Sequence, residues 1–70
     1  MELKYKEQKL RDLFVYHTGI YPKSIRIGRH GIVIAVSWKD LEDNGNYHTH
    51  IEQFLTNLVD RKVCIEILDQ

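Results

Sequence analysis

The sequence has one cysteine, one proline and no long hydrophobic run. A lone Cys64 cannot form an internal disulfide, and one thiolate is too few for a cysteine-rich zinc site. The longest apolar run, residues 32–36, is far shorter than the roughly 20 residues that span a bilayer. Because the first residues also lack the apolar core of a signal peptide, we expect a cytoplasmic protein with no membrane partner.

Neither sign of charge is in excess, but the charges are unevenly distributed along the chain. Ten basic and ten acidic residues give a net charge of zero. Residues 1–30 hold seven basic and three acidic residues, a net charge of +4, and residues 31–70 hold three and seven, a net charge of −4. If folding keeps these parts separate, the resulting dipole could steer a partner or a second copy. If folding mixes them, both are ordinary solvated surface.

Two stretches have the hydrophobic spacing of amphipathic helices. In residues 2–17 the apolar positions recur at helical intervals, and Gly19 follows as a helix C-cap. A second apolar stripe occupies residues 47–59. This helix begins either at an Asn46 cap or one turn later, where Thr49 and Glu52 could form a capping box. The polar segment before it, residues 39–46, is predicted to be a loop with an Asn-Gly turn.

Two β-rich runs flank Arg29 and His30 and predict a hairpin with a two-residue loop, for which the glycine on each side would supply backbone freedom. In the resulting register Ile27 lies opposite Ile32, and the next pair along is also two isoleucines. One face is then all isoleucine and is continued by Trp38 at the end of the second strand. A slip of one residue would destroy this face, so the register is well specified.

Residues 63–68 alternate as a third strand. The order α-β-β-α-β predicts a single α+β domain over residues 1–70, a small two-layer sandwich in which both helices cover one face of a three-stranded sheet. A right-handed crossover would make the third strand parallel to the second. Pairing beside the second strand, or antiparallel beside the first, both remain open.

The sheet face opposite the helices is the predicted self-association face. Its small and apolar members are Val33, Ala35, Cys64 and Leu68, and they alternate with polar residues. Such a face suits either solvent or the close approach of a second sheet in a homodimer. An uncovered edge strand is another route to self-association.

No grouping of residues predicts catalysis, a cofactor or a bound metal. His48 and His50 would point about 200° apart on a helix, so they converge on a metal only if the chain is extended there. His17 on the first apolar stripe is more typical of a boundary residue. Cys64 lies within a predicted strand, and the glycines at 28 and 31 lie between two strands, which is not the setting of a phosphate-binding loop.

The main alternative is nucleic-acid binding. Lys23, Arg26, Arg29 and His30 are predicted to surround the hairpin, where they could contact phosphates. The first helix would extend this basic surface with Lys4, Lys6, Lys9 and Arg11. Against this, the isoelectric point of about 6.9 is low and no known nucleic-acid-binding motif is present. The sequence therefore predicts a small non-catalytic protein-interaction module, typical of a bacterial or phage accessory protein, with another protein or a second copy as its partner.

Overall fold

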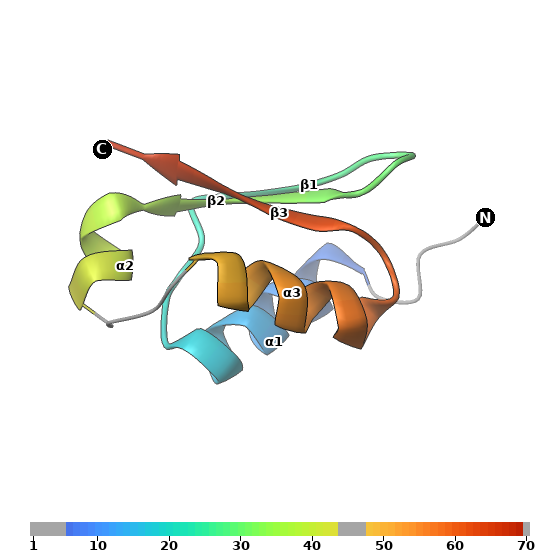
Figure 1. The fold of residues 1–70 in the computed structure, drawn as a ribbon, viewed down its shortest axis with the longest axis horizontal. Coiled ribbons are helices and arrows are strands. Elements are labelled where there is room, and N and C mark those ends of the chain that lie inside the picture. Colours follow the sequence, from blue (N-terminus) through green and yellow to red (C-terminus); the bar gives the residue numbers. More distant parts are fainter. Residues whose placement is uncertain (1–5, 44–47, 70) are drawn as a thin grey trace.

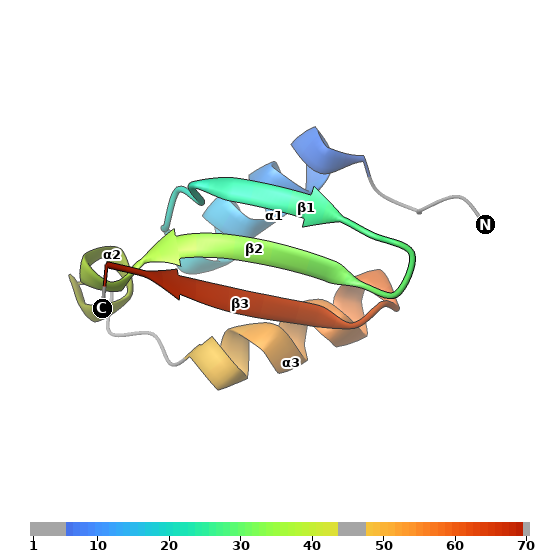
Figure 2. The ribbon, with the colours of Figure 1, turned by 90° about the horizontal axis from the view of Figure 1, so that it is seen from above.

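The computed structural model describes residues 6–43 and 48–69, which form a three-stranded sheet with helices packed on one face (Figure 1). Along the chain the elements are α1 (Glu7–Thr18), β1 (Ser24–Ile27), β2 (Ile32–Ser37), α2 (Trp38–Asp43), α3 (His48–Val59) and β3 (Val63–Leu68). The long helices α1 and α3 lie beneath the same face of the sheet, and the short α2 lies at one end of it (Figures 1 and 2). The predicted α+β fold is confirmed, with α2 as an addition.

The central strand, β2, pairs with β1 in the predicted register. The antiparallel pairs run from Ser24 opposite Ala35 to Ile27 opposite Ile32. The chain turns between the strands at residues 29–30, as the spacing of the isoleucines requires. The face that carries these isoleucines is the one that the long helices cover.

The third strand lies beside β2 and runs parallel to it, from Ile32 opposite Val63 to Ser37 opposite Leu68. The long connection through α3 makes this parallel pairing possible. Of the two pairings that the sequence left open, the third strand therefore adopts the one beside the second strand. The sheet order is β1-β2-β3, so β1 and β3 are both edge strands (Figure 2).

The glycines around the turn have a different role from the one predicted. Neither Gly28 nor Gly31 adopts a left-handed φ; among the described glycines only Gly19 does, with φ 74° at the C-cap of α1. A Cβ on Gly31 would lie 2.8 Å from the carbonyl oxygen of Lys62, which accepts a hydrogen bond from the Ile32 N–H. Gly31 is therefore needed for the close approach of the turn to the start of β3.

The hydrophobic core lies between the sheet and the helices, and every described helix and strand contributes to it. Its members are Leu10, Phe14, Ile20, Ile25, Ile32, Ile34, Val36, Leu41, Ile51, Leu55, Val59, Val63 and Ile65. Phe14 and Val36 have no exposed surface. Because β2 is the central strand, its core-facing residues are among the most deeply buried side chains of the protein.

Trp38 does not continue the isoleucine face, and this prediction was wrong. It is the first residue of α2, in the segment expected to be a loop, and it is 39% exposed. The Ser37 Oγ accepts a hydrogen bond from the Lys39 N–H at 3.2 Å and so caps the helix. Leu41 is buried and anchors α2 to the core. Ile27, next to the turn, was also expected in the core but is 39% exposed.

Some predicted boundaries fall outside the described residues. The first helix was predicted from residue 2, whereas the described helix begins at Glu7. The Asn-Gly turn and the Asn46 cap fall in residues 44–47. Because α3 begins at His48, Thr49 lies inside the helix and is not its N-cap.

Candidate functional site

An ion pair crosses the sheet face opposite the helices. Arg26 on β1 and Glu66 on β3 approach to 3.2 Å between Nη2 and Oε1. Because neighbouring strands lie about 4.8 Å apart and β2 separates these two, the paired side chains must lie over β2. In the register, Arg26 is opposite Val33 and Glu66 is opposite Ala35, so the ion pair passes over these two side chains.

All four residues of the predicted self-association face lie on this side of the sheet. Cys64 is exposed, Val33 and Leu68 are half-buried, and Ala35 is only 2% exposed. The low exposure of Ala35 follows from its central position and from the ion pair above it. The face therefore offers a partner little continuous apolar surface.

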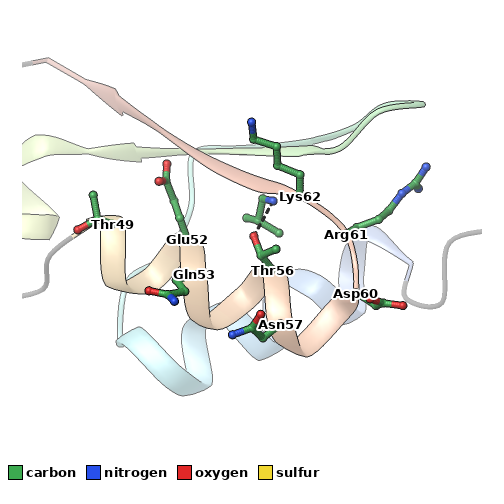
Figure 3. A pocket seen from close by; sticks show the side chains of 9 residues that line it. Thr49, Glu52, Gln53, Thr56, Asn57, Asp60, Arg61 and Lys62 are labelled. Carbon is green, nitrogen blue, oxygen red and sulfur yellow. Dashed lines mark hydrogen bonds between the residues drawn. The ribbon is translucent and has the colours of Figure 1, made fainter.

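At the outer edge of β3, side chains of α3 accept hydrogen bonds from two outward N–H groups, and we call this the closed edge; no such bond to the Ile67 N–H is present in the described residues. The hydrogen bond from the Ile32 N–H to the Lys62 carbonyl fixes which residues of β3 face β2, and it leaves the N–H groups of Val63 and Ile65 on the outer edge. The Val63 N–H donates to Thr56 Oγ1 at 2.9 Å (Figure 3), and the Ile65 N–H donates to Glu52 Oε2 at 2.6 Å. A strand arriving at this edge would find two of its donors already used.

The outer edge of β1 differs in its hydrogen bonds, although the Ile25 residue is itself only 5% exposed. The Gly28 N–H donates to the Gly31 carbonyl at 2.8 Å, and this pairing leaves the backbone N–H and C=O groups of Ile25 and Ile27 pointing away from β2. Within residues 6–43 and 48–69, no side chain bonds to these groups. The nearest side-chain contact is made just before the strand, where Arg11 Nη1 donates to the Pro22 carbonyl at 3.1 Å.

An open groove of about 740 Å³ runs beside α3 at the β3 edge (Figure 3). It is lined by Thr49, Glu52, Gln53, Thr56, Asn57, Asp60, Arg61, Lys62 and Val63. This lining contains neither histidine nor cysteine, and its charged side chains are Glu52, Asp60, Arg61 and Lys62. The two groups that close the β3 edge form part of the groove wall.

The histidines singled out from the sequence lie apart from this groove. The His17 ring packs edge-on against Phe54 with ring centroids 4.7 Å apart, and against Tyr16 at 5.0 Å. His17 and His50 line a small cleft of about 170 Å³ between α1 and α3. In the described part of the chain, no three His, Cys, Asp or Glu side chains are placed to hold a metal ion.

The four predicted phosphate-contact residues are not brought together. Arg29 and His30 lie at the turn, Arg26 is paired with Glu66, and Lys23 lies at the opposite end of β1. A different cation, Arg61, lies at the turn, where its Nη2 donates to the Arg29 carbonyl at 2.8 Å. These residues are 32 positions apart, so no local pattern could have indicated the contact.

The charges are segregated along the long axis of the molecule, which measures 36 Å against 20 Å for each of the other two. The end that holds the β1–β2 turn and the α3–β3 connection carries Arg29, Arg61 and Lys62 against Asp60 (Figure 1). The opposite end holds α2, with three carboxylates against one lysine, and also Lys23 before β1 and Asp69 after β3. Two cations of the basic end come from the acidic part of the chain, so the dipole does not simply follow the sequence halves.

No family model, curated protein or solved structure matches this chain. None of the described helices is long and apolar enough to cross a membrane. The functional argument therefore depends on the two sheet edges, the ion-paired face and the charged ends.

Proposed function

We propose that this protein is a non-catalytic protein-interaction module that binds by accepting a partner strand at the edge of β1. The observation that carries the proposal is the difference between the two edges. Unpaired strand edges are templates for other chains, and proteins that do not use them usually cover them or place charges there. Here Glu52 and Thr56 accept hydrogen bonds from two outward N–H groups of β3, whereas no side chain in residues 6–43 and 48–69 bonds to the outward groups of Ile25 and Ile27.

The composition of β1 supports the same proposal. The strand contains no proline. Its one charged residue, Arg26, pairs with Glu66 across the sheet face opposite the helices, which we call the open face, and does not place its charge at the outer edge. Ile27 at 39% exposure and Tyr21 at 74% exposure provide apolar surface at the two ends of the strand. Strand addition combines main-chain hydrogen bonds with side-chain contacts of this kind.

Replacing Ile27 with proline tests the edge directly. The Ile27 N–H points away from β2, so Ile27→Pro removes an outward donor without breaking the β1–β2 ladder. We expect the amount of any protein that copurifies through this edge to fall at least about tenfold, which corresponds to about 1.4 kcal/mol. Quantitative mass spectrometry of material captured from the producing cells measures this amount.

Ile27→Thr is the matched control, because threonine is also β-branched but keeps the N–H. It should retain the partner that Ile27→Pro loses, while circular dichroism shows both variants folded. Equal capture by the proline variant and the wild type would refute strand addition at β1.

Nucleic-acid binding is the second candidate, and the contact of Arg61 with Arg29 favours it by gathering cations at the turn. If nucleic acid is the ligand, Arg29→Ala and Lys62→Ala should each reduce the slope of log affinity against log salt by about 1. Lys23→Ala, at the other end of β1, is the control and should change the slope least. Failure of the wild-type protein to retain DNA or RNA in a low-salt filter-binding assay would eliminate this candidate.

A further inference from the structure

We infer that the strand accepted at the β1 edge is β1 of a second copy of this chain, so that two sheets join into one six-stranded sheet. The inference rests on the proposed function and names its partner. The two β1 strands would run antiparallel about a two-fold axis, and the long helices of both copies would cover the same face of the joined sheet.

The closed β3 edge explains why such an assembly would stop at two copies. A sheet with two open edges can add copies without limit. In this protein the Val63 and Ile65 N–H groups already donate to side chains of α3, and this side of the sheet therefore resists pairing. If each copy can pair only through its β1 edge, the assembly is complete at two copies.

The charge distribution fits this antiparallel arrangement. Rotation by the two-fold axis brings the turn of one copy toward the α2 end of the other. The first carries Arg29, Arg61 and Lys62 against Asp60, and the second carries the three carboxylates of α2 and Asp69 against Lys39 and Lys23. The net charges of the two facing ends are therefore opposite, although Lys23 beside β1 is a cation, and this difference in net charge favours the second copy over a strand from an unrelated chain.

The outward backbone groups restrict the register of the joint. Ile25 and Ile27 must form the hydrogen-bonded pairs, because only their N–H and C=O groups face outward. Placing the two-fold axis at Ile25 sets Arg26 opposite Ser24 of the second copy and Ile27 opposite Lys23, whose N–H already donates to the Ala35 carbonyl, so only the Ile27 N–H can donate in that pair. An axis at Arg26 sets Arg26 opposite Arg26 of the second copy, and directly opposed like charges are unfavourable. An axis at Ile27 sets Ile25 opposite Arg29, which lies in the turn and whose carbonyl already accepts from Arg61. We therefore assign the axis to Ile25.

Sedimentation velocity on the full chain over a concentration series tests the dimer. We expect the wild type and Ile27→Thr to convert from monomer to dimer, and Ile27→Pro to remain monomeric over the same range. Val33→Lys, which alters the open face and not the edge, should still dimerise.

Disulfide trapping tests the register. The exposed native thiol is first removed by Cys64→Ser. In that background the double variant Ser24→Cys with Arg26→Cys should form a covalent dimer in a glutathione redox buffer, because the two sulfurs of facing copies lie within bonding reach. Arg26→Cys alone should not link; if it does, the register at Ile25 is wrong.

The outcomes separate this inference from the proposed function. A chain that stays monomeric throughout overturns the dimer, and the proposed function survives if Ile27→Pro still loses a captured protein. If neither dimer nor proline-sensitive partner is found, both are overturned. A dimer that survives Ile27→Pro but is lost in Val33→Lys overturns the edge contact and assigns the interface to the open face.

Discussion

The Ile34→Ala variant is expected to lose about 2–5 kcal/mol of the free energy of unfolding, because it leaves a cavity in the middle of the core. Ile34 is 2% exposed and lies at the centre of β2, opposite Ile25 on one side and Ile65 on the other. Small domains have a total stability of about 5–15 kcal/mol, so this loss removes a large part of it. Urea denaturation followed by circular dichroism measures the change.

The neighbouring residue provides the control. Val33 is half-buried on the opposite face of the sheet, beneath the Arg26–Glu66 pair. Val33→Ala should cost about 1 kcal/mol or less, because it opens no cavity between the sheet and the helices. A harmless Ile34→Ala together with a costly Val33→Ala would mean that the assignment of the two faces is reversed.

The hairpin could be predicted because two independent signals agree on it. The isoleucines at 25, 27, 32 and 34 share one face only if the chain turns at residues 29–30. Glycines flank those residues, although in the structure neither has a left-handed φ and Gly31 instead allows the close approach of Lys62. The pairing of the third strand could not be derived in the same way. Residues 63–68 alternate equally well beside either neighbour, and the choice depends on how α3 packs against the sheet.

The helix α2 was missed although the sequence carries a signal for it. Ser37 and Asp40 have the spacing of a helix start, and the Ser37 Oγ does accept the Lys39 N–H. The strand pattern that ends at Trp38 masked this signal, because a large apolar residue after Val36 continues the alternation. In the structure Leu41 is buried, and this burial anchors α2 to the core.

The sequence could not predict which edge of the sheet has its outward N–H groups bonded to side chains. The bonds that close β3 join Thr56 to Val63 and Glu52 to Ile65, pairs that are 7 and 13 residues apart. From the sequence, a capping box with Thr49 was one of two alternatives for the start of the helix, and it gave Glu52 a different role. Only the placement of α3 against β3 shows that Glu52 and Thr56, one helical turn apart, face the strand.

Removal of the two side-chain acceptors at the β3 edge is expected to increase the size of the assembly more than any other substitution proposed for this protein. In the double variant Glu52→Ala with Thr56→Val, the Val63 and Ile65 N–H groups lose their acceptors. Each lost hydrogen bond should cost about 0.5–1.5 kcal/mol of stability. Because both edges would then be free, copies should pair β3 with β3 as well as β1 with β1, and light scattering should record particles that keep growing with concentration.

Two further variants show whether growth comes from the edges. Glu52→Gln with Thr56→Ser keeps both acceptor oxygens and should have the same size as the wild type. Adding Ile27→Pro to the opened variant closes β1 again, so that each copy has one free edge and growth should stop at a dimer joined through β3. If the opened variant instead keeps the wild-type size, the hydrogen bonds of Glu52 and Thr56 do not protect the edge. The proposed limit of two copies would then need another explanation, since copies with two pairing edges can continue to add further copies.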